Sequence, residues 1–142
     1  MTPERLFSLA NAAALVGWIL LAAFPRQRLV TATIAGMVLP LLLGVLYLGL
    51  FVSQIGRAQG GFGSLAQVQA LFQNPFLLLA GWVHYLAFDL FIGAWEARDA
   101  ERLGISRWAL LPCQALTFLV GPVGLLAWLG TRAVLARRVP AV

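Results

Sequence analysis

One predicted apolar helix carries most of the titratable groups of this chain. The stretch GWVHYLAFDLFIGAWEARD, residues 81–99, contains the single histidine and three of the five carboxylates: His84, Asp89, Glu96 and Asp99. Carboxyl and imidazole groups are the common general acids and bases of enzymes. An ionisable group at the centre of a membrane-spanning helix costs about 2.5 to 3.5 kcal/mol on insertion scales, so one that persists there usually marks a site. Asp89 is the strongest candidate because it lies well inside the apolar run.

Helical rotation divides these groups between two faces. At about 100° per residue, Trp82, Tyr85, Asp89 and Glu96 share one face of the helix. His84 lies about 140° from Asp89 around the same axis, so a direct contact between them on a straight helix is not expected. We therefore expect each to meet a partner from another helix, or to line opposite walls of one pocket.

A structural role is the alternative for each of these groups. The Asp89 carboxyl could pair with a polar side chain of another element: Asn11, Tyr47 or Gln114. His84 could form an interhelical hydrogen bond, and Glu96 fits either role. Asp99 and Glu101 are expected to form solvated ion pairs at headgroup level with neighbouring arginines: Arg98, Arg102 and Arg107.

The composition is that of a membrane protein. Of 142 residues, 61% are hydrophobic and 11% are charged, whereas soluble domains carry about 25% charged residues. Four apolar segments reach the roughly 20 residues that a spanning helix needs. The sequence thus predicts an all-α integral membrane bundle, one domain over residues 1–142, with four transmembrane helices at 6–24, 29–53, 75–98 and 108–131. Residues 54–74 are more polar and are expected to form a short interfacial segment or a flap over the site.

The basic residues point to lipid as a partner. The net charge is +5, and all ten basic residues are arginines. They lie between or beyond the apolar segments, which favours contact with anionic membrane lipid over nucleic acid, and no nucleic-acid partner is expected. Four spans would place both chain ends on one side and divide the arginines evenly: Arg5, Arg57, Arg132, Arg137 and Arg138 against Arg26, Arg28, Arg98, Arg102 and Arg107. Small-residue faces on the first and last helices are compatible with a homo-oligomer.

The last predicted helix adds polar and small residues to the candidate site. Gln114, Thr117 and Gly121 lie near one stripe, which is ordinary for helix contacts in membranes, while Gly121-Pro122 also leaves a gap that could admit an apolar ligand. One histidine and one cysteine cannot form an ordinary zinc site, and nucleotide-binding motifs are lacking. No metal and no cofactor are expected.

Three stretches resemble a known family. They are FSLANAAALVGWILLAAFPR near the start, NPFLLLAGWVHYLAFDLFIGAWEARD in the middle and PCQALTFLVGPVGLLAW near the end. In this order they are similar to the abscisic-acid-deficient-four-like family, whose plant members are the neoxanthin synthase proteins of plastid membranes. The resemblance covers nearly the whole chain and implies a four-helix integral membrane protein.

The resemblance also implies a chemistry. The plant members are needed to convert violaxanthin to neoxanthin, an isomerisation in which an epoxide opens and a neighbouring C–H is lost to give an allenic alcohol. Such a step needs an acid and a base and no redox cofactor. Carried over by motif, the catalytic candidates are His84, Tyr85, Asp89 and Glu96, with Asp89 expected as acid and His84 as base, or the reverse. The expected substrate-binding residues are Asn11, Trp82, Phe88, Trp95, Gln114, Thr117 and Gly121.

The function predicted from the sequence is therefore a membrane-embedded isomerase or lyase that acts on a carotenoid or related isoprenoid lipid. An all-arginine basic set is common in high-GC bacteria, so we expect a bacterial-type member in the bacterial inner membrane, with a bacterial carotenoid or other isoprenoid as substrate. The alternative is a non-catalytic carotenoid- or lipid-binding protein that assists a partner enzyme. A small transporter is a weaker third interpretation, because four helices without an internal repeat would have to oligomerise to enclose a path.

Overall fold

The computed structural model describes residues 1–135, which form helices and connecting turns without any strand. The all-α prediction is therefore confirmed for this range. In chain order the elements are α1 (Pro3–Ala23), the π-helix η1 (Leu29–Val38), α2 (Leu39–Ser53), α3 (Leu65–Leu71), α4 (Pro75–Arg102), α5 (Arg107–Val120) and α6 (Pro122–Leu135).

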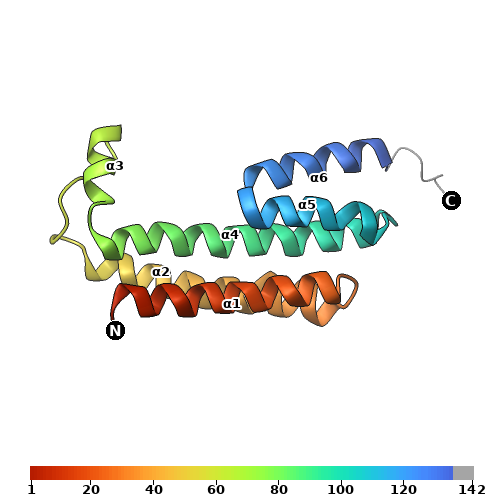
Figure 1. Ribbon diagram of the computed structural model, residues 1–142, viewed down its shortest axis with the longest axis horizontal. Helices are drawn as coiled ribbons and strands as arrows, with labels where there is room; N and C mark the ends of the chain where they lie inside the picture. Colours follow the sequence, from red (N-terminus) through yellow and green to blue (C-terminus); the bar gives the residue numbers. More distant parts are fainter. Residues whose placement is uncertain (136–142) are drawn as a thin grey trace.

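Helix α4 is the centre of the fold. It contacts α1, η1, α2, α5 and α6, and it runs the length of the molecule with α1 and α2 on one side and the α5–α6 pair on the other (Figure 1). Within residues 1–135, three helical segments are long and apolar enough to cross a membrane: Pro3–Ala23, Leu29–Ser53 and Pro75–Arg102. Their outward faces are apolar as well, for instance at Leu41, Val45 and Leu48 of α2.

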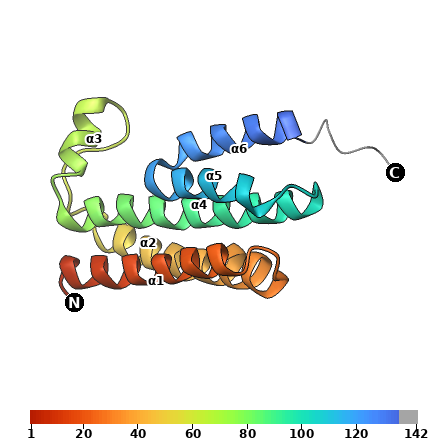
Figure 2. The same ribbon diagram turned by 45° about the vertical axis from the view of Figure 1, so that its right-hand side comes forward.

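The predicted fourth spanning helix, 108–131, is wrong. The chain reverses after Val120, and α5 and α6 lie side by side as a hairpin whose two outer ends are at the same end of the molecule (Figure 2). Each helix has 14 residues, about 21 Å at 1.5 Å per residue and too short for a hydrocarbon layer of about 30 Å. Consequently the start of α1 and the end of α6 lie at opposite ends of the structure, not on one side (Figure 1).

Three residues explain the reversal. Gly121 has a φ of +30°, a backbone conformation that side chains rarely adopt. Pro122 lacks a backbone N–H, so α5 cannot continue through it, whereas it suits the first turn of α6. A Cβ at Gly124 would overlap the backbone and hydroxyl of Thr117, so only glycine lets the two helices approach this closely. What hydropathy reads as one apolar run is therefore two half-length helices.

The hairpin covers only the C-terminal half of α4. Its tip, Gly121, lies against the Asp89 side chain, and Asp89 is about 21 Å from Pro75 and about 20 Å from Arg102 along the helix. The first turns of α4 lie beyond the hairpin tip in Figure 1, and the side-chain contacts of α4 with the hairpin run from Tyr85 to Asp99. A polar side chain is thus placed at the depth where the hairpin stops.

The second span begins as a π-helix, which the sequence did not indicate. The chain carries Pro40 just after η1, and the wide π turns precede this residue, which cannot donate a backbone hydrogen bond. The Arg98 guanidinium donates to the carbonyl oxygen of Thr31 inside η1. A Cβ at Gly36 would collide with that guanidinium, so the absence of a side chain lets Arg98 reach the backbone. Arg98 is therefore engaged in helix packing.

The polar segment between the second and third spans contains α3. The Ser64 hydroxyl caps this helix by accepting from the Gln67 amide at 3.3 Å. Gly60, with a φ of +104°, packs against the α3 backbone where no side chain would fit. Helix α3 stands off the end of the bundle at which α4 begins (Figure 1). Its place at the membrane interface stays a prediction.

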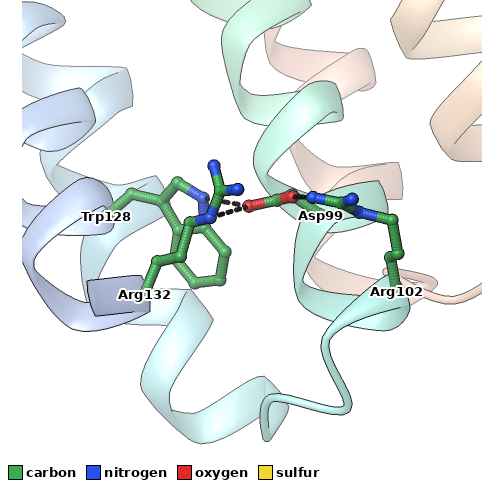
Figure 3. A network of polar contacts seen from close by, with 4 residues as sticks. All are labelled: Asp99, Arg102, Trp128 and Arg132. Carbon is green, nitrogen blue, oxygen red and sulfur yellow. Dashed lines mark hydrogen bonds and ion pairs between the residues drawn. The ribbon is translucent and has the colours of Figure 1, made fainter. Parts of the chain in front are cut away.

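A buried carboxylate fastens α6 to α4. One oxygen of Asp99 is paired with Arg102 at 2.7 Å, and the other is 3.3 Å from Arg132 Nε and accepts from Trp128 Nε1 at 3.3 Å (Figure 3). The Asp99 side chain is only 3% exposed. The expected solvated ion pair at Asp99 is therefore a buried one, because α6 folds back over this residue and supplies two of its three partners.

We expect Asp99→Ala to destabilise the hairpin. Removal of a buried carboxylate leaves Arg132 and the Trp128 indole without their shared acceptor, which should lower the free energy of unfolding by about 2 to 3 kcal/mol. Unfolding in detergent micelles, followed by circular dichroism, measures the change. Glu101→Ala is the matched control, since this carboxylate is exposed about half a helical turn further along α4 and should change stability by less than about 0.5 kcal/mol. Equal effects of the two substitutions would contradict the role of Asp99.

Candidate functional site

The candidate site is centred on Asp89, at the tip of the hairpin. An ideal Cβ built on Gly121 would lie 2.7 and 2.9 Å from the two Asp89 carboxyl oxygens, so this contact exists only because residue 121 is glycine. The Oδ2 atom of Asp89 is buried and has no hydrogen-bond partner among residues 1–135. The carboxyl group is therefore held in position by packing, with hydrogen-bonding capacity left over.

Tyr85 lies one helical turn before Asp89 and ties the hairpin tip to α4. Its hydroxyl donates to the carbonyl oxygen of Phe118 at 3.2 Å. That carbonyl belongs to the last turn of α5, where backbone oxygens have no partner within the helix. Tyr85 thus provides a hydrogen-bond donor for a carbonyl oxygen at the end of α5, at the depth of Asp89. Its ring also packs on Trp82, with 5.3 Å between the ring centroids.

A buried polar core extends from Asp89 toward the C-terminal end of α4. Glu96 is fully buried, and its Oε1 accepts from the Thr117 hydroxyl at 2.8 Å. The Gln114 amide donates to the Gly93 carbonyl at 2.9 Å. Glu96 Oε2 and Gln114 Oε1 are buried and, in the described part of the chain, accept no hydrogen bond. At these positions the face of α5 that packs on α4 is therefore polar, and its side chains donate hydrogen bonds to groups of α4.

An apolar groove approaches the site from the other half of α4. It has a volume of about 770 Å³ and lies between the first turns of α1 and the N-terminal half of α4, with Phe72 at its edge. Its lining is almost entirely apolar and includes Pro3, Phe7, Pro75, Leu78, Leu79, Gly81, Trp82 and Tyr85. The Trp82 indole donates to Asn11 Oδ1 at 3.2 Å across the two helices. The groove reaches Tyr85, one turn from Asp89.

Not all the residues predicted for the site come together. His84 is exposed on another face of α4, where its ring stacks on Phe88 at 4.5 Å and lies 5.7 Å from the Tyr47 ring of α2. Trp95 packs with the core that the hairpin covers. The structure thus groups Tyr85, Asp89, Glu96, Gln114, Thr117 and Gly121 on the hairpin side of α4, whereas Trp82 lines the groove and Asn11 is its hydrogen-bond partner from α1. His84 and Phe88 belong to neither group.

Two features of the site escaped the sequence analysis. One is the contact of Gly124 with Thr117, which holds the hairpin closed. The other is the Asp99 cluster with Trp128 and Arg132. The GPVG motif at residues 121–124 is the signal that could have revealed both. Its proline interrupts the helix, and its two glycines allow other groups to approach the backbone closely. In residues 1–135 no group of three or more His, Cys, Asp and Glu side chains could hold a metal ion.

Comparison with known proteins gives a family. A sequence model described as ABA DEFICIENT 4-like matches residues 5–128 of the chain. The chain belongs to the ABA DEFICIENT 4-like family. Comparisons with curated proteins and with solved structures give no match. Membership in the ABA DEFICIENT 4-like family makes this a carotenoid-related membrane protein, and the matched range contains the groove, the Asp89 site and the hairpin tip.

Gly121→Ala tests the contact at the tip. The new Cβ meets the Asp89 carboxyl group and a positive φ, and strain of this kind costs about 1 to 3 kcal/mol. Thermal unfolding of the purified protein should show that its free energy of unfolding is lower than that of the wild type by this amount. Gly130→Ala is the control, because Gly130 lies in α6 with nothing within 4 Å of its Cβ position.

The double variant Gly121→Ala with Asp89→Ala separates the two causes. If the carboxyl contact contributes, the loss in the double variant is smaller than the sum of the two single losses. Strictly additive losses would show that the backbone conformation alone is responsible.

Proposed function

We propose that this protein is a membrane-embedded, cofactor-independent isomerase that acts on a carotenoid or related isoprenoid lipid through acid and base catalysis at Asp89. One observation carries the proposal: the Asp89 carboxyl group lies at mid-depth in α4, at the point where the apolar groove ends and the hairpin tip begins. The membership in a carotenoid-related family supports the substrate class.

The groove supplies the space for an apolar chain. From Pro75 to Asp89 is about 21 Å along α4, and the lining side chains over this distance are aliphatic and aromatic. Aromatic rings of Phe7, Phe72 and Trp82 offer flat apolar surfaces for a conjugated chain. A ligand lying there would bring its end group to Tyr85 and Asp89, which are the polar side chains at the inner end.

In the proposed reaction, Asp89 gives up one proton and takes one back. The protonated Asp89 carboxyl group gives its proton to an epoxide oxygen as the C–O bond breaks. The carboxylate that results takes the proton that leaves the neighbouring carbon as the new double bond forms, so the carboxyl group returns to its first state. The product is an alcohol isomeric with the substrate, and no oxidant or reductant takes part. A double-bond rearrangement can use the same carboxyl group in the same two roles.

Other side chains assist in this scheme. The Tyr85 hydroxyl can shift from the Phe118 carbonyl to the substrate oxygen and orient it. Glu96, held by Thr117 two turns away on the same face, is the second carboxyl group near the site and a store for a proton. His84 was expected as base, but its neighbours are Phe88 and Tyr47. The proposal therefore assigns both proton transfers to the hairpin side of α4.

Asp89→Asn tests the proposal directly. The amide keeps the shape of the carboxyl group but neither donates an acidic proton nor accepts one, so conversion should fall roughly 100- to 10,000-fold. The protein is expressed in a carotenoid-producing host, and the pigment extracted with it is analysed by chromatography and mass spectrometry. We expect product with the wild type and an isomer of equal mass, the unconverted substrate, with Asp89→Asn.

His84→Ala is the matched control on the same helix. It should behave as the wild type, because His84 faces away from the groove and the hairpin. Conversion that survives Asp89→Asn, with the same pigment bound to both proteins, would overturn catalysis and favour a carotenoid-binding protein that assists another enzyme. Loss of conversion in His84→Ala alone would overturn the assignment of the proton transfers.

Gly81→Leu tests the groove separately from the chemistry. Gly81 lines the groove, and its Cβ position is 3.4 Å from the Phe72 ring, so a leucine there fills ligand space without meeting backbone. We expect the amount of co-purified pigment to fall severalfold while the protein stays folded. Gly44→Leu is the control: it makes the same change in mid-helix on α2, where nothing lies within 4 Å. Equal pigment content in both variants would contradict the groove as binding site.

A further inference from the structure

The reversal at Gly121 redistributes the arginines between the two ends of the molecule. The end at which α1 stops, α4 stops and the hairpin begins and ends is called the arginine end here (Figure 1). Six arginines of the described chain belong to it: Arg26, Arg28, Arg98, Arg102, Arg107 and Arg132. The opposite end has Arg5 and Arg57. Four spans would divide the arginines evenly between the two ends. With three spans the division is six against two, and Arg137 and Arg138 lie outside the described residues.

Acidic side chains do not cancel this asymmetry. Asp99 and Glu101 lie at the arginine end, which leaves an excess of four positive charges from six arginines and two carboxylates. The opposite end has Glu4 beside its two arginines, an excess of one. Asp89 and Glu96 are omitted because they lie more than four residues before the end of α4 at Arg102. The difference of three charges is carried by loops and helix ends close to the spans, where the orientation rule applies.

The arginine end also has the aromatic side chain expected at a lipid interface. Trp108 is 74% exposed at the start of α5, and the Arg107 guanidinium lies over its ring at 5.2 Å. Tryptophan with its apolar body and polar N–H favours the headgroup region, and arginine there is attracted to anionic lipids. Arg102 is also available, since its side chain is 66% exposed although it pairs with Asp99.

We infer that the arginine end faces the cytoplasm and its anionic leaflet, and that the groove therefore takes its ligand from the opposite leaflet. The groove lies wholly on the side of Asp89 away from the arginine end, between the first turns of α1 and α4. On the arginine side of Asp89, the hairpin occupies the corresponding surface of α4. The orientation stands on charge alone, whereas the ligand in the groove rests on the proposed function.

Sided labelling of single cysteines in bacterial cells tests the orientation. Cys113→Ala provides the background, and Gln27→Cys in the α1–η1 turn and Gln59→Cys before α3 report on the two ends, since both side chains are exposed. A membrane-impermeant thiol reagent should label Gln59→Cys in intact spheroplasts. It should label Gln27→Cys only after the cells are opened. The reverse pattern, or labelling of both positions in intact spheroplasts, would overturn the inference.

Charge variants test the cause of the orientation. Arg26→Glu with Arg28→Glu removes the excess of four at the arginine end, so both reporter positions should become labelled in intact spheroplasts as part of the protein inserts the other way. Arg5→Glu with Arg57→Glu makes equal changes at the opposite end and should leave the labelling unchanged. Unchanged labelling in the first pair would overturn the charge argument. Each of these outcomes is independent of pigment content and conversion, so a reversed orientation would not affect the isomerase proposal.

Discussion

The contact between Gly121 and the Asp89 carboxyl group determines where the C-terminal hairpin stops. Any side chain at residue 121 would occupy the space of the carboxyl oxygens, and the reversal at Pro122 turns the chain back at this depth. Because the hairpin ends there, α5 and α6 cover one half of α4 and leave the other half to α1, α2 and lipid. The groove, the buried polar core and the unequal distribution of arginines all depend on this single stopping point.

The two halves of α4 differ in polarity for a physical reason. Ionisable and amide groups in the apolar layer need hydrogen-bonding partners within the protein. The hairpin provides them: Thr117 for Glu96, and Trp128 with Arg132 for Asp99. In the half of α4 before Asp89, Trp82 pairs with Asn11 and Tyr85 pairs with Phe118, and the groove is nearly all apolar, with Glu4 and Ser8 as its polar residues from α1. Asp89 lies at the boundary, with hydrogen-bonding groups on one side and space for an apolar ligand on the other.

Local geometry could be read from the sequence, and long-range partners could not. Helical rotation places Tyr85 and Asp89 on one face and His84 on another, and the contacts in the structure follow that division. The segment 29–53 has the predicted bounds, although its first ten residues form a π-helix. Hydropathy could not reveal the hairpin, because glycine and proline also occur inside continuous spanning helices. The buried partners of Asp99 depend on that hairpin, which is why this carboxylate was expected to be solvated.

Under the proposed function the groove lies within one leaflet of the membrane, so the protein contacts only part of a long ligand. The distance from the open end of α4 to Asp89 is about 21 Å, whereas the hydrocarbon layer is about 30 Å thick. A conjugated chain that spans the layer therefore has only one of its ends inside the protein, and the remainder lies in lipid beyond the hairpin tip. Apolar contacts along the groove distinguish poorly between chains of similar width, since one methylene contributes only about 0.8 kcal/mol. Discrimination between substrates must then come from the end group, through its fit against Gly121 and its hydrogen bonds with Tyr85 and Asp89.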